Sequence, residues 1–418
     1  MKAFLANKDK FFALADSALL SLFRLGIGIV IAKTAGAESF AHYIILTSAL
    51  VIFQTLPGAS IITPLIHLGA GTNRATSQVF FAKSHARLRR YYLWGTVVAV
   101  VAIPVVLREE VPFSIYLGFI GACLASLELN FRRSLLMARF QMLQALAVDV
   151  TIIVFVAAAI LIGWQIGDQA HAAYWWSFFI ASLLGSFWMA RVLSQPNPKD
   201  CPQDQEVELL DQRARKQGGA MLKGSIANSV CSRLQPISLA TFSTTLTVAQ
   251  FGAAWTLIGP MRLLSVAFSN ILRPRLAVQL KRGESDRFYR NLRLSYALIS
   301  GIGVAGILYT LLAGGFTFVL LFGEEFRSAA ILLIPAILYA ILDTTSSIQA
   351  LAIQVRDEDG AQFTARLRIV CGIVSLALLV PACYYFGAMG ALCALLIVES
   401  LYIILSSRKL HRQQPSMS

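Results

Sequence analysis

Long apolar segments alternate with short polar ones along the whole chain. Runs of about 20 apolar residues are typical of helices that cross a bilayer, and hydropathy predicts twelve of them here. The pattern therefore predicts an all-α polytopic membrane protein. The predicted segments are 11–33, 41–69, 91–107, 112–137, 145–163, 172–193, 220–243, 248–272, 294–322, 328–354, 364–386 and 388–407.

Basic residues divide unevenly between alternate loops. If the N-terminus lies in the cytoplasm, only Lys33, Arg108 and Arg327 of the 36 lysines and arginines fall in outside loops, and most others fall in cytoplasmic ones. This positive-inside bias predicts that both termini are cytoplasmic. It also explains the net charge of +14 by contact of basic loops with an anionic leaflet, rather than with nucleic acid.

The longest predicted cytoplasmic loop lies in the middle of the chain. Residues 194–219 are polar, Pro-rich at their start and mixed in charge, so we interpret them as a linker between two six-helix lobes. The predicted organisation is an N-terminal lobe (1–193), this linker, a C-terminal lobe (220–407) and a cytoplasmic tail (408–418).

The two lobes resemble copies of each other. At an offset of 215 residues, Glu128 in the fourth segment corresponds to Asp343 in the tenth. Copies with six helices each share one orientation, as in transporters built from parallel repeats. We therefore expect a substrate to be held between the lobes.

Composition excludes several other classes of protein. The chain is 57% hydrophobic and 14% charged, with a mean hydropathy of +0.66. Its six cysteines form no CxxC pair and its five histidines no HExxH motif, which argues against a disulfide framework and a zinc site. We expect no metal and no cofactor, and an uncleaved first helix rather than a signal peptide.

Three arginines fall near the middles of predicted membrane segments: Arg24, Arg233 and Arg262, in the first, seventh and eighth. A charge at the bilayer centre costs about 2.5–3.5 kcal/mol on insertion scales, so each needs a partner or a wet cavity. Converging guanidiniums would form a cationic cavity for a phosphate or diphosphate, which they bind bidentately. Arg24 also lies on one helical stripe with small polar residues, which favours a polar interior over lipid. The stripe comprises Ser17, Ser21, Arg24 and Gly28.

Five carboxylates also fall within predicted segments, namely Asp16, Glu128, Asp149, Asp343 and Glu399. One interpretation is structural: Asp16, Asp149 or Glu399 pairs with the three arginines, and Glu128 and Asp343 bond to neighbouring hydroxyl groups. The other is that one or more of them carries a coupling ion, H⁺ or Na⁺. The sequence leaves both open.

Glycine and aromatic residues punctuate four apolar stretches: "TAGAESFAHYIIL", "VAQFGAAWTLIGPMRLLSVAFSNILRPRLA", "LFGEEFRSAAILLIPAILYAI" and "YYFGAMGALCALLIVESLYIIL". They resemble stretches of bacterial polysaccharide biosynthesis flippases, the O-antigen repeat-unit transporters of the multidrug/oligosaccharidyl-lipid/polysaccharide (MOP) superfamily. The first resembles the entry to their second helix, the second their eighth-helix region, and the last two their tenth to twelfth helices. The similarity spans nearly the whole chain.

The resemblance implies a V-shaped pair of six-helix lobes that works by alternating access. It implies transport of undecaprenyl-diphosphate-linked oligosaccharide from the inner to the outer leaflet of the bacterial inner membrane, among membrane lipids and beside polysaccharide polymerase or export machinery. Relatives that flip lipid-linked peptidoglycan precursor use arginines in a central cavity, one of them in the first helix. Arg24 matches that role in kind and position, and Arg262 and Arg233 are the further candidates.

Other functions remain as alternatives. A drug exporter of the same superfamily is the nearest, although three midplane arginines would repel a cationic drug. A major-facilitator transporter would carry a G-x-x-x-D-[RK] loop signature after its second helix, which residues 69–90 lack. A membrane-embedded polymerase or ligase would need a sizeable outside loop, and the predicted outside loops are short. We therefore expect a transporter and not an enzyme.

Overall fold

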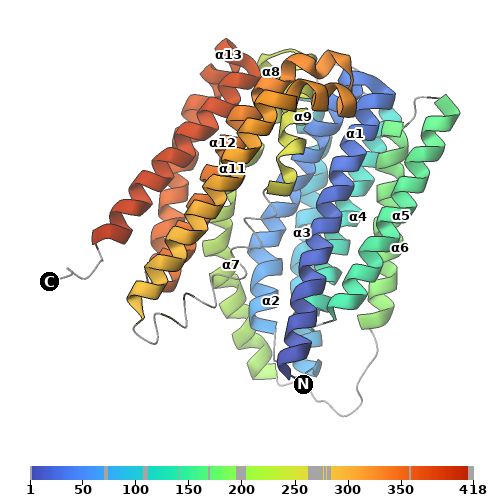
Figure 1. Ribbon diagram of the computed structural model, residues 1–418. Helices are drawn as coiled ribbons and strands as arrows, with labels where there is room; N and C mark the ends of the chain where they lie inside the picture. The colour runs from blue at the N-terminus through green and yellow to red at the C-terminus, as the bar shows by residue number, and fades with distance from the viewer. Residues whose placement is uncertain are drawn as a thin grey trace. The chain divides into compact units, whose positions relative to one another are not determined.

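The computed structural model describes residues 2–69, 74–106, 112–139, 141–167, 170–193, 204–261, 276, 279, 284–356 and 359–412. These residues are nearly all helical (Figure 1). The helices are α1 (Lys2–Pro57), the π-helix η1 (Gly58–Ile62), α2 (Thr63–Gly69), α3 (Arg74–Val106), α4 (Phe113–Ala138), α5 (Met142–Gly167), α6 (Ala170–Leu193), α7 (Asp204–Arg233), α8 (Gln235–Phe242), α9 (Thr245–Leu257), α11 (Ser285–Phe322), the 3₁₀ helix η2 (Glu324–Leu332), α12 (Leu333–Arg356) and α13 (Gly360–Arg412).

Among the described residues, seven helical stretches are long and apolar enough to cross a membrane. Two of them are far longer than one span, with 49 residues in Ala18–Ile66 and 51 in Gly360–Leu410. Each contains a glycine with positive φ, Gly36 at 76° and Gly387 at 54°, a conformation that costs glycine little because it has no Cβ. Each stretch therefore holds two of the predicted segments, separated by a kink rather than by a loop. The total of twelve stays a prediction.

The chain forms two compact units. Unit 1 comprises Met1–Phe23 and Thr34–Ile226, and unit 2 comprises Arg24–Lys33 and Ala227–Ser418. The boundary at residue 226 lies inside α7, which begins at Asp204, within the segment expected to be a linker. That part of α7 is helical because it is amphipathic: apolar residues at helical spacing are buried, and the charged side chains that the structure describes there, other than Asp211, are exposed or half-buried. The buried apolar residues are Val207, Leu210 and Ala214.

In unit 1, α6 packs against both α4 and α5. The approach of α4 to α6 depends on a small residue, because a Cβ at Gly121 would lie 2.9 Å from the Phe179 ring. An apolar cluster joins η1, α2, α3 and α4 to the first turns of α7. Its buried members are Ile61, Ile62, Leu65, Phe80, Phe81, Leu88, Phe131, Leu135, Val207, Leu210 and Ala214.

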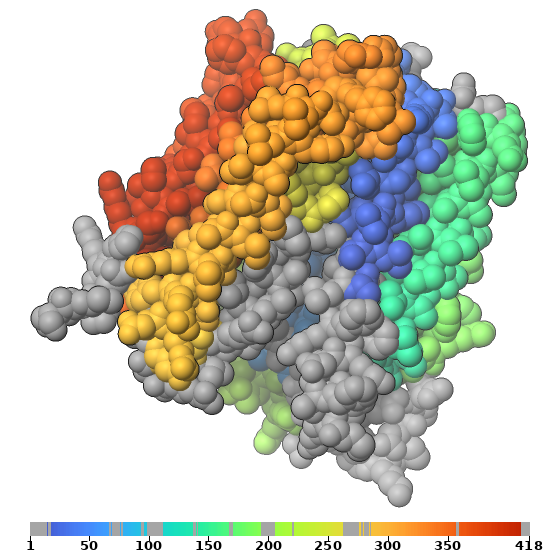
Figure 2. Space-filling model, viewed as in Figure 1, coloured from blue at the N-terminus to red at the C-terminus, as the bar shows by residue number. Residues whose placement is uncertain are grey.

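In unit 2, α12 packs against α13 and α11. Apolar side chains of α11 cover the outer surface of this unit, where the helix runs in yellow to orange across the view (Figure 2). Leu312 is 88% exposed and Phe316 70%. A row of large exposed apolar residues is the surface expected of a helix that faces lipid. The others on α11 include Leu294, Leu298, Val304, Leu308, Leu311 and Leu320.

The contact between α7 and η1 depends on Gly218. A Cβ at this position would lie 2.1 Å from the carbonyl oxygen of Ser60, whereas one at Gly219 would meet nothing within 4 Å. We expect Gly218→Ala to destabilise the protein by about 1–3 kcal/mol, because backbone atoms must move apart. Gly219→Ala is the matched control and should be neutral or stabilising by up to about 1 kcal/mol, since alanine favours the helix. Thermal unfolding in detergent measures both, and equal transition temperatures for the two variants would contradict the close contact.

Candidate functional sites in the two units

The structure describes two of the three predicted midplane arginines. Arg24 is exposed on α1, inside the apolar stretch Ala18–Ile66. Arg233 is the last residue of α7 and is half-buried. Both belong to unit 2, while Arg262 lies outside the described residues. No ion pair joins Arg24 to a residue whose side chain the structure describes. The convergence of the three arginines therefore stays a prediction.

Two of the predicted carboxylates have arginine partners that the count of basic residues assigned to cytoplasmic loops. Asp149 on α5 accepts a hydrogen bond from Nε of Arg133, over 2.7 Å. Glu399 accepts one from Nη1 of Arg368 over 2.6 Å. Both arginines lie inside apolar helical stretches, Arg133 in Phe113–Leu136 of α4 and Arg368 in Gly360–Leu410 of α13. Asp16 lies in α1, and its side chain is outside the described set.

Arg368 is the centre of a buried polar network in unit 2. Its second terminal nitrogen donates to the Ser346 hydroxyl on α12 over 2.9 Å, and its guanidinium lies 4.1 Å from the centre of the Tyr402 ring. Asp343, one turn before Ser346, is half-buried on α12. The network thus ties α12 to both halves of α13 through one permanently charged side chain.

Glu128 on α4 is the centre of a second polar cluster, in unit 1. Its Oε1 accepts a hydrogen bond from Nε of Arg132 over 2.6 Å. Its Oε2 lies 2.8 Å from Nε2 of His85, and the Tyr92 hydroxyl donates to the same oxygen. Hydropathy identified Glu128 but not its partners. The i, i+4 spacing of Glu128 and Arg132 could have indicated that these two residues pair. His85 and Tyr92 come from α3, and nothing in the sequence indicated that they contact Glu128.

This cluster borders a cavity of about 400 Å³ between α3, α4 and the end of α6. Its lining combines charged and polar side chains with apolar ones. It is lined by Gln78, Phe81, Ala82, His85, Glu128, Phe131, Arg132, Leu135, Arg139, Ala190 and Leu193. The described residues contain no group of three or more His, Cys, Asp or Glu side chains that could hold a metal ion.

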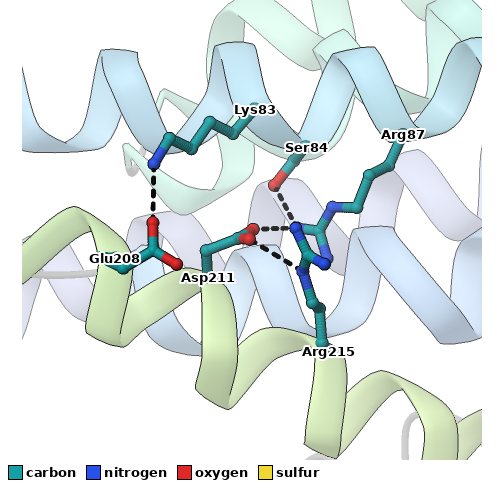
Figure 3. Close-up of polar contacts among 6 residues, drawn as sticks. All are labelled: Lys83, Ser84, Arg87, Glu208, Asp211 and Arg215. Carbon is teal, nitrogen blue, oxygen red and sulfur yellow. Dashed lines mark hydrogen bonds and ion pairs between the residues drawn. The ribbon is translucent and has the colours of Figure 1, made fainter.

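A third polar cluster fastens α7 to α3 (Figure 3). Nη2 of Arg87 lies 2.8 Å from Oδ1 of the buried Asp211, and Nε of Arg215 donates to Oδ2 over 2.9 Å. Nζ of Lys83 donates to Oε2 of Glu208 over 3.0 Å. Burial lowers the pKa of Arg87 while Asp211 acts to raise it, and the hydrogen bond from Lys83 lowers the pKa of Glu208. These pairs explain why a largely polar stretch of α7 packs as a helix.

The two ion pairs between α3 and α7 should differ in strength. Asp211 is almost fully buried, so Asp211→Asn removes the charge that balances Arg87 and should weaken α7 docking by about 1–3 kcal/mol. Glu208 is exposed and water screens its pair with Lys83, so Glu208→Gln is the milder control. Hydrogen–deuterium exchange of residues 204–219 measures the docking. Equal protection in the two variants would contradict this ranking.

No protein-family model matches the sequence, and no curated protein matches it significantly. Several solved structures have a fold similar to that of this chain. An inward-facing multidrug resistance MATE family transporter of the MOP superfamily has a TM-score of 0.75 at 11% identity, over 95% of this chain and 96% of that one. Lipid II flippase MurJ in an inward closed conformation has a TM-score of 0.71 at 12% identity, over 96% and 87% of the two chains. The Vibrio cholerae MATE transporter VcmN in its bent form has 0.58 at 15% identity, over 98% of each. The chain therefore has the fold of MOP-superfamily transporters.

Proposed function

We propose that the chain moves undecaprenyl-diphosphate-linked oligosaccharide from the inner to the outer leaflet of the bacterial inner membrane by alternating access. The observation that carries this proposal is the exposed guanidinium of Arg24 inside the apolar stretch of α1. Hydrocarbon does not accommodate an unpaired charge cheaply, so Arg24 needs water or an anionic ligand. A diphosphate matches the planar fork of a guanidinium in charge and geometry.

The fold supports a lipid flippase and a drug exporter of the MATE type equally. Charge separates these two candidates, because an arginine in the transport path repels a cationic drug and attracts a phosphorylated lipid. Arg233 and Arg262 are further proposed contacts of the diphosphate. In this proposal the lipid tail stays in the bilayer, and binding differs between the inward and outward states.

Ion coupling is a separate part of the proposal. Asp149, Glu399 and Glu128 each have an arginine partner, and arginine keeps its charge under all physiological conditions. Such pairs favour a structural role for these three carboxylates. We propose Asp343 or Asp16 as the site that binds H⁺ or Na⁺, because each is a carboxylate inside a predicted membrane segment. Transport by Asp343→Asn and Asp16→Asn with the pH and sodium dependence of the wild type would remove both residues from this role.

The test is to delete the gene and extract the lipid-linked glycans of the cells. Mass spectrometry should then find more undecaprenyl-diphosphate-linked oligosaccharide than in the wild type, and its mass identifies the repeat unit. The same strain should export ethidium at the wild-type rate. An unchanged lipid-linked pool together with retained ethidium would instead identify a drug exporter.

A further inference from the structure

We propose that the cavity in unit 1 binds the phosphate headgroup of an anionic membrane phospholipid. This cavity lies beside α3, α4 and α6, all in unit 1, whereas Arg24 and Arg233 belong to unit 2. It is therefore a different site from the one proposed for the transported lipid. The cavity volume of about 400 Å³ falls within the range of small-molecule sites.

The lining of the cavity has an excess of positive charge. Both oxygens of its one carboxylate, Glu128, already accept hydrogen bonds, from Arg132 on one side and from His85 and Tyr92 on the other. A guanidinium has five N–H donors, and Arg132 bonds to Glu128 through Nε and Nη2, which leaves the donors on Nη1 for a ligand. Arg139 adds a second positive charge. Two arginines and one carboxylate leave one positive charge in excess in the lining, which favours an anion.

Two contacts hold the Arg139 side chain beside the cavity. Its Nη1 donates to the carbonyl oxygen of Leu193 over 3.4 Å, and its guanidinium lies 5.6 Å from the centre of the Phe81 ring. These contacts hold the charge between the ends of α4 and α6. A guanidinium that is already oriented loses little side-chain entropy when it binds a phosphate.

The rest of the cavity wall is apolar, which favours a lipid over free phosphate. The apolar lining residues are Phe81, Ala82, Phe131, Leu135, Ala190 and Leu193. The apolar stretches of α4 and α6 end at Leu136 and Leu193, so the two arginines lie where a span gives way to the headgroup layer. Basic pockets between transmembrane helices at this level are known sites for anionic lipid headgroups.

The experiment uses the full-length protein purified in detergent and mixed with phosphatidylglycerol or phosphatidylcholine. Native mass spectrometry counts the lipid molecules retained. We expect the wild type to retain one phosphatidylglycerol and little phosphatidylcholine. Arg139→Gln should weaken retention about 10-fold, because a charge-assisted bond to phosphate is lost. Ala190→Trp should also weaken retention of phosphatidylglycerol, because the larger side chain fills part of the cavity without changing a charge.

Arg191→Gln is the matched control, since Arg191 is exposed near the same end of α6 but does not line the cavity. It should retain phosphatidylglycerol as the wild type does, and so should Arg24→Ala, which separates this site from the transport site. Added inorganic phosphate at millimolar concentration should not displace the lipid. Displacement by phosphate, equal retention of phosphatidylcholine, or wild-type retention by both Arg139→Gln and Ala190→Trp would each overturn the proposal.

Discussion

Arg24→Ala is expected to abolish transport of the lipid-linked oligosaccharide while the protein still inserts and folds. The exposed guanidinium makes no ion pair with any side chain that the structure describes, so its removal should cost little stability. A hydrogen bond to a charged group contributes about 1.5–3 kcal/mol. The affinity for the diphosphate should therefore fall about 10- to 100-fold. Calorimetric titration of the purified protein with undecaprenyl diphosphate measures this loss directly.

Two further variants control for charge and for position on the helix. Arg24→Lys keeps the charge but loses the bidentate geometry, so its affinity should lie between those of the wild type and Arg24→Ala. Lys33→Ala removes an exposed cation from the same helix, nine residues further on, and should bind as the wild type does. Wild-type affinity in Arg24→Ala, or an equal loss in Lys33→Ala, would show that Arg24 is not a headgroup contact.

Arg368→Met is expected to cause the largest loss of stability. The Arg368 side chain is 13% exposed and that of Glu399 3%. Oε2 of Glu399 is buried and accepts no hydrogen bond from the described residues, so Arg368 supplies its balancing charge. Removing one partner of a buried ion pair costs about 3–5 kcal/mol, because the other charge is left uncompensated. Thermal unfolding in detergent should show this as a strongly lowered transition temperature.

The double variant Arg368→Met/Glu399→Gln distinguishes an ion pair from simple packing. Because both charges are removed, it should be more stable than Arg368→Met alone, and the coupling free energy of the double-mutant cycle should be large. Additive losses of stability would indicate that the two side chains do not depend on each other. The same cycle on Arg133 and Asp149 is the corresponding test in unit 1.

Hydropathy predicted the helical class of the fold well, but not where the helices begin and end. The pattern placed loops near residues 34–40 and at 387, where the chain instead continues as kinked helices at Gly36 and Gly387. A glycine at positive φ turns the helix axis without an intervening polar loop, and hydropathy does not detect this. Hydropathy also missed the start of α7. The buried face of this part of the helix includes a charged residue, Asp211, whose charge is balanced by Arg87.

Hydropathy also does not show which charged residues inside the helices pair with one another. The sequence identified Glu128, Asp149 and Glu399 as isolated charges in apolar segments, which is a strong local signal. Arg133 and Arg368, the partners of Asp149 and Glu399, lie in sequence close to cytoplasmic loops, so charge counting treated them as topology signals. Which arginine meets which carboxylate depends on helix packing, and 16 or 31 residues of separation give no periodic clue. The convergence of Arg24, Arg233 and Arg262 depends on such packing too.

The most direct test of the central claim is a flipping assay with the purified protein in liposomes. The probe is an undecaprenyl-diphosphate-linked oligosaccharide with a fluorescent label on its sugar, and a membrane-impermeant reductant quenches only the label that reaches the outer surface. The protein is predicted to make all of the probe accessible, to leave ethidium in place, and to lose this activity in Arg24→Ala. Accessibility no greater than in protein-free liposomes, or equal activity in Arg24→Ala, would contradict the account.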